Sequence, residues 1–286
     1  MTRPRAIISV HAHPDDEASK GAAIIAKYKD RGARAILVTA TGGEEGEILN
    51  PAMDTAEVRE NLVSVRLAEL ELAAKIIGYD RVEMLGYRDS GMPDSEANQN
   101  PASFARANLE EVAGKIALII RQERPDVMLT YPEIQTRYPH PDHLRVYEVS
   151  MRARELAADE DFAGDGLEPY EVQKVYFHIW TRERMFELHQ KFGELGLESP
   201  FSLDWFEGVV PDYEATAKIP IDGYFGVRSR ALRAHATQID PNSMNWFGLS
   251  DEHQEDAYPS EDLFLAIAPA GYEPDRPETD IFAGLV

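Results

Sequence analysis

Short apolar runs rich in β-branched residues alternate with longer amphipathic stretches over the first half of this chain. The short runs have the length of buried strands, and the longer stretches carry apolar residues at helical spacing. Such alternation is typical of βαβ units and predicts an α/β fold with a mostly parallel sheet flanked by helices. The predicted strands are 6–10, 34–41, 81–87 and 126–131, and the predicted helices are 22–32, 54–78, 101–125 and 144–157.

The predicted helix 54–78 has clear start and stop signals. Asp54 and Glu57 have the spacing of a capping box at its N-terminus, and Gly78 suits its C-terminal end. Between them the apolar residues keep roughly helical spacing, which predicts an amphipathic helix. These residues are Val58, Leu62, Val65, Leu72 and Ile76.

The alternation stops after about residue 165. Residues 171–180 and 218–222 have strand patterns, but the segments around them do not continue the earlier rhythm. No change in composition is strong enough to mark a linker between separate domains. We therefore predict one domain, 1–286, with an α/β core over about 1–165 and a C-terminal α+β elaboration over about 166–286.

Composition then excludes several classes of function. Lys and Arg number 29 against 51 Asp and Glu, which gives a formal net charge of −22 at pH 7. So acidic a chain is not expected to bind nucleic acid or an anionic membrane. No segment approaches the roughly 20 apolar residues of a membrane span, and no signal peptide is recognisable, so we expect a cytoplasmic protein. Because cysteine is absent, any metal must be bound by His, Asp or Glu.

Two similar motifs stand behind predicted strands, where helices begin. The first is His13-Pro14-Asp15-Asp16 and the second is His140-Pro141-Asp142-His143. Proline suits the first helical position and acids suit the first turn, so both motifs can be interpreted simply as helix starts. Helix capping, however, requires neither the histidines nor two adjacent carboxylates, which repel each other unless a cation or a proton intervenes.

Together the two motifs can supply the ligands of a catalytic metal. In open α/β sheets, ligands bind at the carboxyl ends of the strands, where turns from distant parts of the chain meet. His13, Asp16 and His143 offer three N/O ligands and leave a fourth position open, as in catalytic zinc sites. The same ligand set also suits iron.

The other polar residues of the motifs suit the chemistry at such a metal. Asp15 lies between the two ligands of the first motif and is free to act as a general base on metal-bound water. His140 is then a candidate general acid or oxyanion stabiliser. Asp142 is close enough along the chain to orient His140 or to keep it protonated.

Six segments spread over nearly the whole chain are similar to one known family: HAHPDDEASKG, TGGEEGEILNPAMD, GYRDSGM, YPHPDH, KVYFHIWTRERM and RALRAHATQIDPN. In these segments the chain resembles the PIG-L (LmbE-like) N-deacetylases, and most closely their mycothiol S-conjugate amidase branch. The resemblance implies a Rossmann-like fold and one zinc ion per chain, bound by His13, Asp16 and His143. It also implies that Asp15 is the base and that His140 stabilises the tetrahedral intermediate.

The resemblance further implies a substrate. This is a mycothiol S-conjugate or a related amino-sugar amide, whose amide on the glucosamine nitrogen is hydrolysed to a mercapturic acid and glucosaminyl-inositol. Tyr138 would polarise the amide carbonyl, and Lys20 follows the first motif as in the amidase branch. The elaboration would complete the substrate pocket. The residues implied to line its sugar and inositol part are Glu47, Arg66 and Asp89.

Other interpretations stay open at this point. Within enzymes, the alternative is a deacetylase of N-acetylglucosaminyl-inositol or a related N-acetyl sugar. A non-catalytic binding protein is less favoured, because no GxGxxG motif follows the first strand. Without the family, Arg66 would form a surface ion pair, Lys20 would face solvent, and His235 would be a buried, hydrogen-bonded histidine. A homo-oligomer is compatible with the sequence.

Overall fold

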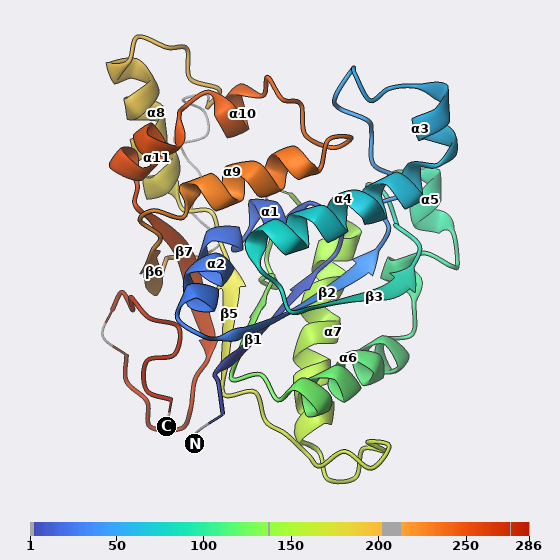
Figure 1. The fold of residues 1–286 in the computed structure, drawn as a ribbon. Helices are drawn as coiled ribbons and strands as arrows, with labels where there is room; N and C mark the ends of the chain where they lie inside the picture. The colour runs from blue at the N-terminus through green and yellow to red at the C-terminus, as the bar shows by residue number, and fades with distance from the viewer. Residues whose placement is uncertain (1–2, 137, 202–212, 275, 286) are drawn as a thin grey trace.

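The computed structural model describes residues 3–136, 138–201, 213–274 and 276–285 (Figure 1). Within them one sheet has seven strands: β1 (Ala6–His11), β2 (Arg34–Thr41), β3 (Arg81–Tyr87), β4 (Val127–Thr130), β5 (Lys174–His178), β6 (Ala217–Pro220) and β7 (Ser260–Ile267). Their order is β3-β2-β1-β4-β5-β7-β6. Neighbours from β3 through β5 pair in parallel, whereas β7 pairs antiparallel with both β5 and β6. The predicted mostly parallel sheet is confirmed.

Helices cover both faces of this sheet. They are α1 (Asp16–Ser19), α2 (Ala22–Asp30), α3 (Ala56–Glu60), α4 (Leu62–Ile77), α5 (Glu96–Gln99), α6 (Leu109–Glu123), α7 (Pro141–Ala158), α8 (Arg182–Glu194), α9 (Phe225–Ala234), α10 (Met244–Phe247) and α11 (Asp251–Ala257), with a 3-10 helix at Phe104–Arg106. Alternate residues of β1 face opposite layers, as the strand period requires. Ile8 and Val10 pack with α6 and α7, whereas Ile7 packs with α2, α4 and α9.

The strand order reverses between β1 and β4. From β1 the chain adds β2 and then β3 on one side, and β4 is placed on the other side of β1. Such a switch point opens a crevice at the carboxyl ends of the strands. It brings the turn after β1, with His13, beside the loop after β4, with His140, although the two are far apart in the sequence.

The predicted helix 54–78 is two helices. Thr55, not Asp54, is the N-cap of α3, and Asp54 pairs instead with Arg59. The helix ends at Asn61, whose side-chain amide donates to a backbone carbonyl in the preceding turn and so competes with helical bonding. The predicted apolar face is wrong at Leu72, which is 52% exposed, whereas Val58, Leu62, Val65 and Ile76 are half-buried. The buried face of α4 is formed by Arg66, Glu69, Leu70, Ala73, Ala74 and Ile77.

Three other features of the fold differ from the prediction. The helix predicted from residue 101 begins at Leu109, because Asn108 caps α6. Strand β7 was not predicted, since its acids Glu261 and Asp262 are buried and obscure the apolar pattern. The parallel sheet also continues past residue 165, because β5 pairs with β4. Among the described helices, none is both long and apolar enough to cross a membrane.

The segment after β7 packs back along the sheet. Lys174 is fully buried, and its Nζ pairs with the Glu278 carboxylate at 2.6 Å. The Tyr176 hydroxyl donates to the same carboxylate at 2.8 Å. Nearby, Arg5 donates to the carbonyl of Leu285 at 2.8 Å. The two ends of the described chain therefore lie side by side, near the N-terminal end of β1 (Figure 1).

Candidate metal centre and active site

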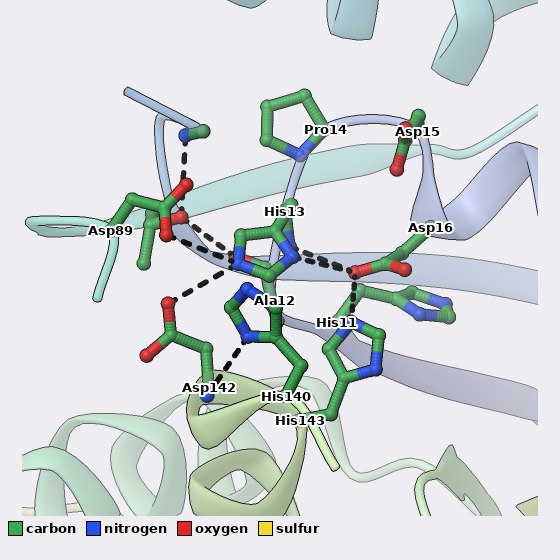
Figure 2. Close-up of polar contacts among 12 residues, drawn as sticks. His11, Ala12, His13, Pro14, Asp15, Asp16, Asp89, His140, Asp142 and His143 are labelled. Atoms are coloured by element: carbon green, nitrogen blue, oxygen red, sulfur yellow. Dashed lines mark hydrogen bonds and ion pairs between the residues drawn. The ribbon is translucent and has the colours of Figure 1, made fainter. Parts of the chain in front are cut away.

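The two histidine motifs meet at the switch point (Figure 2). The first motif forms the turn between β1 and α1, and the second begins α7. His140 is the N-cap of α7, because its Nδ1 accepts a hydrogen bond from the Asp142 backbone N–H at 3.2 Å. The helix-start interpretation therefore holds for the second motif. It does not explain why the histidines and carboxylates of both motifs converge.

His13, Asp16 and His143 form a compact group of possible metal ligands. Asp16 Oδ2 lies 3.5 Å from His13 Nδ1 and 3.4 Å from His143 Nε2, and the three ligand atoms lie within 4.8 Å of one another. Donors bound at about 2.0–2.1 Å to one tetrahedral zinc ion lie about 3.4 Å apart, so the group fits zinc. Burial raises the pKa of Asp16, but Lys20 and His143 outweigh burial and hold that pKa well below its usual range. The carboxylate is therefore anionic, as a ligand must be.

A second group of possible ligands, His13 with Asp89 and His140, shares His13. His13 Nε2 lies 3.2 Å from Asp142 Oδ2 and 3.6 Å from Asp89 Oδ1. Two carboxylates beside Nε2 favour a proton there, which leaves the lone pair on Nδ1, facing Asp16. The geometry therefore favours the group that includes Asp16, and it makes Asp142 the carboxylate that orients His13.

Asp15 follows His13 in the turn and lines a cavity over the metal group. Its backbone has φ 106° and ψ −24°, a left-handed conformation that costs about 1–3 kcal/mol outside glycine and is found at functional sites. Burial, together with the charge of Asp16, raises the pKa of Asp15 to about 7. A carboxyl group with such a pKa exchanges protons near neutral pH, as a general base does.

Asp142 does not orient His140 through its carboxylate, which corrects the expectation from the sequence. That carboxylate accepts a hydrogen bond from the Ser90 backbone N–H at 2.9 Å and faces His13. Because His140 Nδ1 is an acceptor, the proton of the neutral ring resides on Nε2. Burial and the nearby His13 lower the pKa of His140 to about 4. The ring is therefore neutral at pH 7, and the idea that Asp142 keeps it protonated is wrong.

Lys20 and Tyr138 lie beside the metal group, and both line the cavity. Lys20 Nζ pairs with Asp16 Oδ1 at 2.7 Å, so this lysine does not simply face solvent. Tyr138 is 53% exposed, and its ring centroid lies 5.4 Å from that of His143 and 5.8 Å from that of His140. Both side chains are thus placed to meet a substrate bound at the metal group.

The cavity has a volume of about 870 Å³, and Glu47, Arg66 and Asp89 all line it. Arg66 is buried, so it is not a surface residue. Its Nη2 donates to the carbonyls of Gly46 and Glu47 at 2.9 and 3.0 Å, while its Nε and Nη1 have no hydrogen-bond partner within the described part of the chain. Arg66 therefore fixes the loop after β2, and its remaining donors are buried. The Glu47 side chain is exposed at the cavity edge.

Glu17 is the main residue that reasoning from the sequence missed. It is the third acid of HPDDE, it is fully buried, and it contacts both the Asp15 backbone and His235. The crowding of three acids was the available signal, but only two of them received roles. His235 is buried and hydrogen-bonded, as predicted. Trp180, Met185 and Trp246 also line the cavity.

Comparison with known proteins identifies the family. Residues 8–154 match the family model described as PIG-L: GlcNAc-PI de-N-acetylase. A mycothiol S-conjugate amidase from Streptomyces coelicolor is 39% identical over 294 residues, which cover 100% of this chain and 99% of the relative. The chain belongs to the PIG-L family. The predicted resemblance is confirmed, and the chain is a hydrolase of the amidase and deacetylase class.

Two further proteins to which this PIG-L chain is similar are deacetylases. A 1D-myo-inositol 2-acetamido-2-deoxy-alpha-D-glucopyranoside deacetylase from Streptomyces griseus is 38% identical, over 98% of this chain and 89% of the relative. The solved N,N'-diacetylchitobiose deacetylase from Pyrococcus horikoshii matches with a TM-score of 0.62 at 18% identity, over 91% of this chain and 83% of that structure. At this identity the match concerns the fold, which is the predicted LmbE-like one.

Proposed function

We propose that this enzyme hydrolyses the amide on the glucosamine nitrogen of mycothiol S-conjugates. The products are a mercapturic acid and glucosaminyl-inositol. One zinc ion per chain is the proposed cofactor, with iron(II) as the alternative metal. The observation that carries the proposal is the unlike character of the cavity walls on the two sides of the metal group.

The sheet order separates these walls. Loops after β2 and β3 lie on one side of β1, whereas the loop after β5 lies on the other side, beyond β4. The first wall carries the charged residues Glu45, Glu47, Arg66 and Asp89 beside the exposed Leu49 and Met92, and the charged groups suit the hydroxyls of a sugar and an inositol. An amide bond held over the metal group would place its amine side along this wall.

Aromatic side chains gather on the opposite wall, where Arg182 also lines the cavity. This wall carries Trp180 and Met185, and Trp246 joins it with its ring 6.0 Å from that of Trp180 at 75°. Arg184 lies over the Trp180 ring at 5.2 Å, yet Trp180 remains 39% exposed. An exposed aromatic surface in a cavity marks a place for an apolar ligand group. An acetyl group would not use it, whereas the thioether substituent of an S-conjugate would.

Within the proposed mechanism, His13, Asp16 and His143 would hold the metal. A zinc ion bound there would act as a Lewis acid toward the amide carbonyl and would lower the pKa of water to about 7. Asp15 accepts a proton from the attacking water, whose oxygen bonds to the carbonyl carbon. The Nε2–H of neutral His140 and the hydroxyl of Tyr138 donate hydrogen bonds to the oxygen on which negative charge develops.

The same residues complete the reaction. As the C–N bond breaks, the protonated Asp15 carboxyl returns its proton to the glucosamine nitrogen, which leaves as a neutral amine. The acyl part leaves as a carboxylic acid. Asp142 contributes by orienting the His13 ring. The Lys20 ammonium contributes through its ion pair with Asp16, one of the proposed metal ligands.

Side-by-side kinetics test the proposal. The bimane S-conjugate of mycothiol is expected to have a much higher kcat/KM than N-acetylglucosaminyl-inositol. Trp180→Ala should lower kcat/KM for the conjugate about tenfold or more, since burial of an apolar group is worth about 1.5–3 kcal/mol, and should leave the acetyl substrate unaffected. Phe186→Ala is the matched control, because Phe186 is an aromatic residue of α8 that does not line the cavity. A higher kcat/KM for the acetyl substrate would refute the proposal.

The second candidate is deacetylation of N-acetylglucosaminyl-inositol. The similarity to the Streptomyces griseus deacetylase supports it, and the polar wall suits that substrate equally well. Deacetylation of an N-acetyl sugar would not use the aromatic wall of the cavity. A non-catalytic binding protein is not supported, because the relatives are hydrolases.

A further inference from the structure

The peptide unit between Pro14 and Asp15 is held at both of its polar atoms. Its carbonyl, on Pro14, accepts a hydrogen bond from Gln238 Nε2 at 2.6 Å. Its N–H, on Asp15, donates to Glu17 Oε2 at 3.0 Å. The plane of one peptide unit helps to set φ of the residue that follows it, so these two bonds act directly on the φ of 106° at Asp15.

Glu17 is itself fixed from the distant C-terminal part of the chain. Its Oε1 lies 2.6 Å from His235 Nε2, and both side chains are fully buried. His235 follows α9 directly, and Gln238 lies three residues later. The short segment after α9 therefore contacts both polar atoms of this peptide. Gln238 bonds to its carbonyl directly, and His235 acts on its N–H through Glu17.

We infer that Glu17, His235 and Gln238 are positioning residues that hold Asp15 in its strained conformation and so aim its carboxylate at the substrate. A residue other than glycine persists in such a conformation only where its surroundings over-determine it. Here the surroundings are two hydrogen bonds on one peptide, supported by a buried ion pair. This inference rests on the proposed role of Asp15 as the base.

The same segment also offers a matched control. Thr237 lies between His235 and Gln238, and its hydroxyl donates to Glu69 of α4 at 2.6 Å, away from the catalytic turn. Its backbone N–H makes a second bond to Glu69. Thr237→Val removes a buried hydrogen bond from this segment but leaves the Pro14–Asp15 peptide held. It therefore reports the effect of loosening the segment alone.

The experiment compares zinc-loaded Glu17→Ala, His235→Ala, His235→Gln and Thr237→Val with the wild type, using the bimane conjugate of mycothiol. Misplacement of a reacting group by about 1 Å costs on the order of 100-fold in rate. We expect kcat of the two alanine variants to fall by about that factor, with KM and zinc stoichiometry unchanged. His235→Gln, which keeps an N–H donor, should recover most of kcat, and Thr237→Val should match the wild type.

A structural measurement gives a readout that does not depend on activity. In a crystal structure of His235→Ala, the Pro14–Asp15 peptide should be turned and φ of Asp15 should be negative. Wild-type kcat in both alanine variants, together with an unchanged positive φ, would overturn the inference. If His235→Ala does not fold, Gln238→Met removes the bond to the Pro14 carbonyl, together with the 3.4 Å contact to His235 Nδ1, and should still lower kcat by about tenfold.

Asp15→Asn separates this inference from the proposed function. If Asp15→Asn retains turnover with zinc bound, Asp15 is not the base, so its proposed role and the positioning inference fail while the proposed hydrolysis stands. If Asp15→Asn is inactive while the Glu17 and His235 variants keep wild-type kcat, only the positioning inference fails. If the enzyme acts only on N-acetylglucosaminyl-inositol, the same comparison made with that substrate tests the positioning role unchanged.

Discussion

Replacing Asp142 should weaken metal binding rather than act through His140. Asp142 is fully buried, its Oδ2 lies 3.2 Å from His13 Nε2, and it accepts the Ser90 N–H. Loss of the carboxylate that orients a metal-ligating histidine costs about 10- to 100-fold in metal affinity, which corresponds to about 1.4–2.7 kcal/mol. Asp89, 3.6 Å from the same nitrogen, can partly replace it. We therefore expect Asp142→Ala to raise the Kd for zinc nearer tenfold, and Asp142→Asn, which keeps an acceptor, to raise it less.

Competition with a zinc-binding fluorescent chelator measures this Kd on the purified protein. The control is Asp126→Ala, because Asp126 is an equally buried carboxylate that accepts the Ala6 backbone N–H at the far end of β1. That variant should lose stability without a change in zinc Kd. If Asp142→Ala binds zinc as tightly as the wild type but loses kcat, Asp142 acts through His140, and the reasoning from the structure is wrong.

Three further outcomes follow from the same contacts. Asp15→Asn should keep its zinc and lose at least about 100-fold in kcat, since general-base catalysis contributes about 10²–10⁴-fold; near-normal turnover would contradict the base role. Burial lowers the pKa of His11 to about 3, below the unfolded value of about 6.5, so its contribution to stability is present above pH 6.5 and is lost as pH falls toward 3. In urea unfolding between pH 7 and 5, His11→Gln should therefore lose less stability than the wild type, by up to about 1.4 kcal/mol per pH unit, and equal slopes would contradict this. Glu278→Ala should cost about 3–5 kcal/mol, because it leaves the buried Lys174 unpaired, whereas the exposed control Glu183→Ala should cost at most about 1 kcal/mol.

The sequence predicted the strands from β1 to β5 because apolar residues run along them, buried in β1, β2, β4 and β5 and half-buried in β3. It failed where buried side chains are charged. Arg66 and Glu69 occupy the inner face of α4 because they bond to loop carbonyls and to Thr237, so the apolar residues of that segment indicated the buried face only in part. Such long-range partners cannot be read from periodicity.

At the site, the sequence indicated which residues converge but not how each is oriented. Convergence of the two motifs follows from the switch point between β1 and β4, which the βαβ pattern implies. The Asp142 carboxylate is oriented by the backbone N–H of Ser90, which lies in the loop after β3. The Glu17 carboxylate is oriented by His235, which follows α9. Both contacts arise only in the folded chain.

The pairing of Arg5 with the carbonyl of Leu285 has a practical consequence for handling the enzyme. These residues lie where β1 begins, whereas His13 and the cavity follow the other end of that strand, about 20 Å away over its six residues. A short linker could join the two ends, and new ends could be opened in the exposed turn at Asp165 and Gly166 without touching the cavity. Tethered to a solid support through either Arg5 or Leu285, the protein would turn its cavity toward the solution that carries the substrate.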